Sequence, residues 1–160
     1  MMNIEELYYS KSDWEKVEYI KELEWKDIDS KWDLYNAILL NEEDYYLARI
    51  EVLKVLALYD IPISYKDSIA SSLYTVLTTS SDEEVVEYAV MATVNFMTYS
   101  FIKDYVKDIV VDKTQEINNR YSAFDSLVRS LEINEKIEIL EKLLSDEEMK
   151  VSAERVLKEL

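Results

Sequence analysis

The sequence predicts an all-α protein. No segment shows the strict period-two alternation of a half-buried strand over more than a few residues. Apolar residues recur instead at helical spacing, behind a series of helix-start signals. The 160 residues include no glycine and one proline, Pro62, so the tight turns of β-hairpins lack the residue they most need. We expect one domain over residues 1–160.

Start and stop signals place the helices of the N-terminal half. Ser12-Asp13-Trp14-Glu15 is a capping box, in which the Ser and Glu side chains each satisfy a backbone N–H of the first turn. Ser30 and Ser64 are caps for two later helices, and Pro62 ends the helix between them because proline cannot continue it. The helices expected here cover residues 12–24, 30–40, 43–59 and 64–78.

The same signals continue in the C-terminal half. Ser81 and Ser145 each precede three acids, which complement the positive end of a helix dipole. Asn134 caps a further helix, and apolar spacing indicates two more before it. The helices expected here cover residues 81–98, 101–111, 117–131, 134–144 and 145–160, which brings the total to about nine.

Three segments repeat one frame: a cap, an acidic first turn and an alanine eight residues after the start. Residues 81–89 and 145–153 share the whole frame, and residues 40–48 have it without the serine. The alanines are Ala48, Ala89 and Ala153, with Ala123 in a degenerate fourth copy. Alanine lets a neighbouring helix approach closely, so we expect these four positions to be packed.

The frame resembles that of HEAT-like helical repeats over about residues 30–160. The resemblance implies a short right-handed solenoid. Its N-terminal capping helices would be residues 1–28, and its helical-hairpin repeats residues 29–160. An irregular helical bundle is the alternative.

Two details qualify this repeat array. Glu51 falls on the apolar stripe that follows Ala48 and is a misfit there. Three tryptophans lie in the first two expected helices, where we expect them to seal the N-terminal end of the array. They are Trp14, Trp25 and Trp32.

The residue types that are missing exclude most site chemistry. The chain has no Gly, His or Cys. Without Gly, phosphate-binding loops, dinucleotide fingerprints and nucleophile elbows are excluded. Without His and Cys there is no thiolate nucleophile, imidazole base or standard zinc site. We expect a protein that is not an enzyme and binds no cofactor or metal, its acidic clusters serving as helix caps.

The charge indicates which partners suit the chain. Thirty-four acidic residues against eighteen basic ones give a formal charge of −16. Nucleic acid and anionic membranes both attract clustered Lys and Arg, so this charge argues against both. No apolar run approaches the roughly 20 residues of a membrane span, and the first residues lack a secretory signal, which favours the cytoplasm. A protein partner with a basic surface fits instead.

Two acid-rich segments are candidate partner-binding sites. From Asp67 to Ile102 there is no Lys or Arg but there are five acids, which predicts an unpaired negative face. In the other segment Tyr46, the more exposed ring of a tyrosine pair, lies beside acids that suit Lys and Arg. The candidate residues are Glu42, Glu43, Asp44, Tyr46, Asp82, Glu83, Glu84, Glu87, Tyr88, Met91 and Asn95. Packing of Tyr88 and Met91 beneath a neighbouring helix is the alternative for those two.

In size, acidity and helical repetition the chain resembles the immunity proteins of bacterial polymorphic and contact-dependent toxin systems. The resemblance implies that its carboxylates pair with Lys and Arg of a cognate basic toxin, for example a nuclease domain, and occlude that surface. A phage-type inhibitor that mimics DNA charge would use the same physics. A HEAT-like adaptor or scaffold without inhibitory role is the alternative, and a HEAT-like repeat enzyme is a weaker one.

Overall fold

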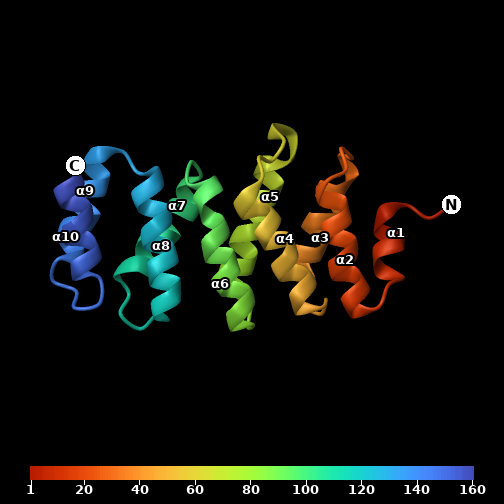
Figure 1. Cartoon of the computed structure of the whole chain (residues 1–160), viewed down its shortest axis with the longest axis horizontal. Coiled ribbons are helices and arrows are strands. Elements are labelled where there is room, and N and C mark those ends of the chain that lie inside the picture. The colour runs from red at the N-terminus through yellow and green to blue at the C-terminus, as the bar shows by residue number, and fades with distance from the viewer. The chain divides into compact units, whose positions relative to one another are not determined.

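The structure is a computed structural model that describes all 160 residues, and it confirms the all-α class. Ten α-helices and one short 3-10 helix, η1, account for its regular structure, and there is no strand. The elements are α1 (Ile4–Tyr9), α2 (Asp13–Glu24), α3 (Ser30–Leu40), α4 (Tyr46–Leu58), α5 (Ile63–Thr79), α6 (Glu83–Ala92), η1 (Thr93–Phe96), α7 (Ser100–Val111), α8 (Ile117–Ser130), α9 (Ile133–Leu143) and α10 (Lys150–Glu159) (Figure 1). They divide between two compact units, residues 1–92 and 93–160, which we describe separately.

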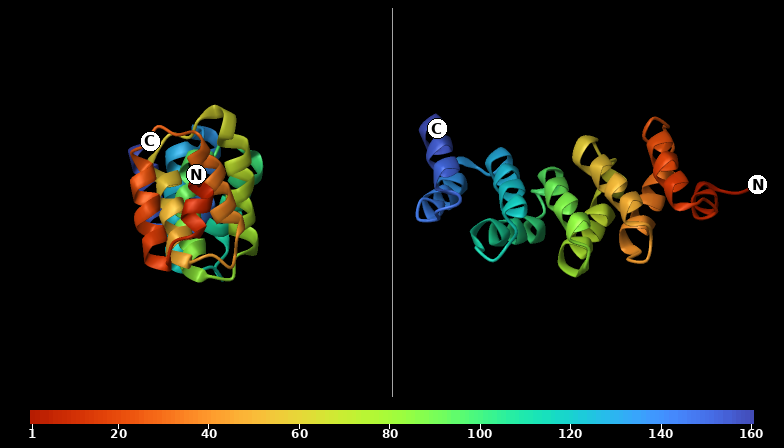
Figure 2. Two further views of the ribbon diagram at one scale, coloured as in Figure 1. Left: turned by 90° about the vertical axis from the view of Figure 1, so that its right-hand side faces the viewer. Right: turned by 60° about the horizontal axis from the view of Figure 1, so that its bottom comes forward.

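In residues 1–92 the helices pack in two rows. The even-numbered helices α2, α4 and α6 contact one another in that order. The odd-numbered helices α1, α3 and α5 do the same, and α3–α4 and α5–α6 join the rows as antiparallel hairpins (Figure 2). Each helix of the even row therefore keeps one side directed away from the core.

In residues 93–160 the packing centres on α7 and α8. These two helices pack against each other, and both contact η1. Helix α9 contacts α7 on one side and α10 on the other. The arrangement of all these hairpins as a right-handed solenoid stays a prediction.

The four alanines of the sequence frame are all core residues. Ala48, Ala89, Ala123 and Ala153 are each 0% exposed. They lie on α4, α6, α8 and α10, the second helix of each hairpin. Their burial confirms that these positions are packed.

The turns within the hairpins are built without left-handed backbone. No residue has a positive φ, which is why the chain folds without glycine. A polar side chain just after the first helix of each hairpin accepts the N–H two residues further on, which imitates a backbone turn. The four pairs are Asn41–Glu43 (3.1 Å), Ser80–Asp82 (3.3 Å), Asp112–Thr114 (2.9 Å) and Asp146–Glu148 (3.1 Å).

Some expected boundaries were wrong. Helix α1 was missed, although Asn3 and Glu6 form a capping box at its start. Helix α10 begins at Lys150 and not at residue 145, because the Asp146 carboxylate holds a turn over the next three residues. The Ser145 hydroxyl is no helix cap: it donates back to the Lys142 carbonyl.

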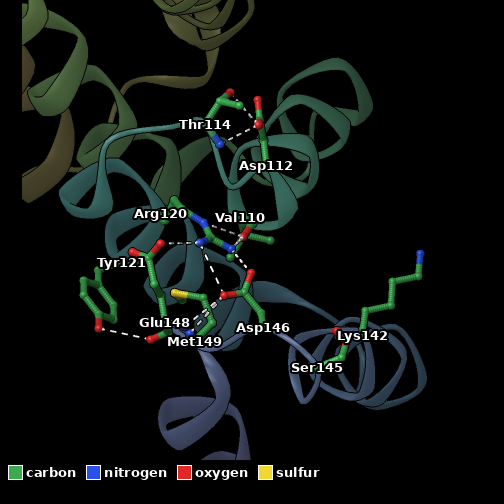
Figure 3. A network of polar contacts seen from close by, with 10 residues as sticks. All are labelled: Val110, Asp112, Thr114, Arg120, Tyr121, Lys142, Ser145, Asp146, Glu148 and Met149. Carbon is green, nitrogen blue, oxygen red and sulfur yellow. Dashed lines mark hydrogen bonds and ion pairs between the residues drawn. The ribbon is translucent and has the colours of Figure 1, made fainter.

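Two buried arginines tie the second helix of a hairpin to the end of the first. Arg49 Nη2 on α4 donates to the Leu39 carbonyl at 2.8 Å. Arg120 Nε and Nη2 on α8 donate to the Val110 carbonyl at 3.1 and 2.8 Å (Figure 3). Both carbonyls lie in the last turn of a helix, where backbone oxygens lack helical partners and a cation is favoured.

Candidate functional site

One side of α6 collects exposed acids and large side chains. Val85, Ala89 and Ala92 turn inward and are buried. The opposite arc of the helix consists of Glu83, Glu84, Glu87, Tyr88 and Met91, which we call the acidic face of α6. Glu83 and Glu84 are exposed, Glu87 and Tyr88 are half-buried, and Met91 is 45% exposed.

The three glutamates of the acidic face form no ion pair with any Lys or Arg. Glu83 and Glu84 lie in the first turn of α6, where the helix dipole favours negative charge. Asp82, just before the helix, accepts the Val85 N–H at 3.0 Å and so caps it. Asp82 therefore has a structural role, whereas the three glutamates are free to meet a partner.

One base does reach the tyrosine of the acidic face, although it forms an ion pair with none of the three glutamates. Lys54 on α4 places its Nζ 5.5 Å from the centre of the Tyr88 ring, and 3.7 Å from Glu51 Oε2. Helix α4 lies beside α6, so a cation absent from the local sequence arrives from the neighbouring helix. Tyr88 is thus half-buried against Lys54, whereas Met91 stays exposed.

The other candidate segment is only partly available. Asp44 is 7% exposed and accepts from Tyr8 Oη at 2.9 Å and from Lys16 Nζ at 3.0 Å. Burial and the hydrogen bond to Asp44 raise the pKa of Tyr8. The prediction that Asp44 binds a partner was therefore wrong. Its buried carboxylate ties α1 and α2 to the start of α4.

The other candidates of this segment also differ in whether a neighbouring side chain already engages them. Glu42 is paired with the buried Arg49 at 3.2 Å. Glu43 is exposed, and Tyr46 is 41% exposed with its ring edge-on to Tyr45. Glu42, Glu43 and Tyr46 therefore all keep the exposure that the sequence predicted, but Glu42 is already engaged by Arg49.

The structure also shows where Asn95 and the three tryptophans lie. Asn95 lies in η1, in the second unit, and is half-buried. Trp32 is 5% exposed, but Trp14 and Trp25 are 58% and 82% exposed. Those two exposed rings therefore do not seal the end of the helical array.

A group of ionisable side chains between α2 and α4 was not predicted from the sequence. Its one visible sign was Glu51, an acid on an otherwise apolar stripe. Glu51 is 8% exposed, and its carboxyl group lies against that of Glu24. Tyr59 Oη donates to Glu24 Oε2 at 3.4 Å. Burial, and then the charge of Glu51, raise the pKa of Glu24. We call Glu24, Glu51, Tyr35 and Tyr59 the carboxyl cluster.

The second unit has a surface hollow of about 480 Å³ between α7 and α9. Both lysines and aspartates line it, among them Lys107, Lys142, Asp104 and Asp108. The nearby Asp146 is already held by Arg120, and Lys142 lies apart from that pair (Figure 3). The mixed charge gives the hollow no preference for an anion or a cation.

Other kinds of site find no support. No three acidic side chains converge as ligands for a metal ion. None of the helices has the length and apolar content that a bilayer crossing requires. Comparison with protein-family models, with curated proteins and with solved structures finds no match.

Proposed function

We propose that the chain is a non-catalytic acidic module that binds a basic protein surface through the acidic face of α6. The observation that carries the proposal is the combination of unpaired acids and large side chains on that face. Three glutamates without ion pairs adjoin an exposed methionine and a half-buried tyrosine. Carboxylates steer a basic partner into contact, while Tyr and Met supply contact area at low entropic cost.

We further propose that binding neutralises the partner, as in immunity proteins that cover a cognate basic toxin such as a nuclease domain in the bacterial cytoplasm. A nuclease grips its substrate through Lys and Arg, so the residues that pair with Glu83, Glu84 and Glu87 would be withdrawn from nucleic acid. The net charge of −16 supports this reading, since it repels nucleic acid and attracts the toxin. A HEAT-like adaptor that holds a basic partner without inhibiting it is the alternative.

Co-expression tests both readings. The C-terminal domain encoded by the neighbouring gene is expressed with and without this chain, and growth and co-purification are measured. Immunity predicts that growth is rescued and that the two proteins co-purify. Co-purification without rescue would favour the adaptor, and the absence of both would contradict immunity for that pair.

Charge reversal tests the surface. The triple variant E83K/E84K/E87K is expected to lose rescue and to weaken binding by at least about tenfold. Its matched control is E138K/E141K/E147K, which changes the charge equally at exposed acids without ion pairs in the second unit. Circular dichroism of both variants checks that each is folded. Binding that survives both the reversal on α6 and about 0.5 M salt would contradict the electrostatic mechanism.

A further inference from the structure

The carboxyl cluster brings two acids together with too little positive charge nearby to neutralise both. Glu24 comes from the last turn of α2 and Glu51 from the middle of α4. Two carboxylates in contact repel each other, and burial adds to the cost of ionising both. The raised pKa of Glu24 expresses that cost, with burial as its first cause and Glu51 as the second.

The cations that face the cluster do not satisfy it. Lys54 Nζ is 3.7 Å from Glu51 Oε2, beyond hydrogen-bond distance, and its side chain is 46% exposed. Lys21 lowers the pKa of Glu24 as the weakest of the causes and is itself paired with Glu18 at 3.8 Å. The titratable groups around the cluster are Glu24, Glu51, Tyr35, Tyr59, Lys21 and Lys54.

A buried hydroxyl without a hydrogen-bond partner belongs to the same group of interacting side chains. Tyr35 is 0% exposed, and its Oη has no hydrogen-bond partner. Its pKa is raised by burial and then by the charges of Glu24, Tyr59 and Glu51, so this hydroxyl feels both carboxyl groups. A buried hydroxyl that makes no hydrogen bond is costly and rare, so a polar group that reached it would be stabilised there.

We propose that the carboxyl cluster is the receptor for an arginine side chain of the basic partner. A guanidinium group carries five N–H donors in one plane, so it can bridge the two carboxylates and also donate to a tyrosine oxygen. A lysine ammonium is a point charge and bridges such a pair less well. The assignment rests on the proposed function and gives it a second contact point, on α2 and α4, beside the acidic face of α6.

The approach to the cluster suits such a guest. Glu24 and Tyr59 are half-buried and thus reachable from solvent. Next to them in the chain, Trp25 and Leu58 are 82% and 77% exposed. Tryptophan is the aromatic side chain on which a guanidinium group stacks best.

The test is a titration of the full chain with a tetra-arginine peptide whose ends are acetylated and amidated, followed by NMR of the side-chain carboxyl and tyrosine ring signals. The neutral control is the same peptide with citrulline in place of arginine. We expect saturable shifts at Glu24, Glu51, Tyr35 and Tyr59, and a lower titration midpoint for Glu24 when the arginine peptide is bound. Equal shifts with the citrulline peptide would overturn the assignment.

Variants separate this site from the acidic face of α6. E24Q/E51Q is expected to weaken binding of the arginine peptide about tenfold, and Y35F about threefold. E22Q, at an exposed acid without an ion pair on the same helix, is expected to leave the affinity unchanged. An unchanged affinity in E24Q/E51Q would overturn the assignment.

The positions of the shifts distinguish the two proposals. Shifts at Glu83, Glu84 and Glu87 without any at the carboxyl cluster would overturn the arginine receptor and leave the proposed function standing. The absence of shifts at both places would also overturn the receptor, and co-expression would then decide the function by itself.

Discussion

Arg49 and Arg120 occupy equivalent positions in two different hairpins, and each donates to a carbonyl ten residues before it. Both are buried, and each also meets an acid: Arg49 pairs with Glu42, and Arg120 with Asp146. They differ in how many of their N–H donors are satisfied, since Arg49 Nε has no partner whereas Arg120 Nε donates to the Val110 carbonyl. Arg120 is therefore the stronger anchor of the two.

Replacement of Arg120 is expected to be severe. R120M should lower the free energy of unfolding by about 3–5 kcal/mol, because it leaves Asp146 as a buried charge without its cation. R120K, which keeps the charge but loses the planar pair of donors, should lose less. Urea unfolding followed by circular dichroism measures both. R129M is the control, since Arg129 and its partner Asp125 are exposed, and a change within about 0.5 kcal/mol is expected.

The same pair makes stability depend on pH. Burial alone would raise the pKa of Asp146, but the hydrogen bond and charge of Arg120 and two backbone N–H groups outweigh it, so the net pKa is lowered. The stabilisation is therefore present above the unfolded-state pKa of about 3.9 and is lost as the pH falls through the lower folded-state value. The difference in unfolding free energy between wild type and D146N should be largest near neutral pH and shrink in acid. A difference that stays constant down to about pH 2 would contradict this.

Two fully buried tyrosines should respond oppositely to loss of the hydroxyl. Y8F removes a hydrogen bond to the Asp44 carboxylate and should cost about 1.5–3 kcal/mol. Y35F removes a hydroxyl that has no partner, so we expect a neutral or slightly stabilising change. Both rings are 0% exposed, so each variant is the control of the other. Thermal unfolding measures the pair, and equal losses would show that the Tyr35 hydroxyl is satisfied in solution.

The alanine frame should not accept larger side chains. A89L is expected to cost about 1–3 kcal/mol, because Ala89 is 0% exposed where α6 packs on α4 and α5. A57L, at a half-buried alanine of α4, is the matched control and should change stability by less than about 0.5 kcal/mol. Urea unfolding compares the two, and an equal loss in both would argue against close packing at Ala89.

Local patterns of the sequence predicted the helices and the alanine frame, but Ser30, Ser64 and Asn134 lie inside their helices and are not the caps. The capping box at Ser12 and Glu15 is present, and all four frame alanines are buried. Such signals depend on residues within one or two turns of each other. Helix α1 had the same kind of signal, in Asn3 and Glu6, and could have been found from it.

The roles of individual acids were not predictable in this way. Asp44 and Asp146 look like members of acidic first turns, yet both are buried against partners far away in the chain. Tyr8 lies 36 residues from Asp44, and Arg120 lies 26 residues from Asp146. Spacing within a helix carries no information on such pairs. For the same reason the contact of Glu51 with Glu24 could not be found, although Glu51 itself was a visible misfit.

The turns of the four hairpins have one further consequence. Because every residue has a negative φ, no position requires the one amino acid that tolerates left-handed backbone. At Asn41, Ser80, Asp112 and Asp146 the requirement is only for a short side chain that accepts a hydrogen bond, which four residue types meet. The fold can thus pass through many substitutions in its connections without backbone strain, and its turn sequences are free to diverge while its shape persists.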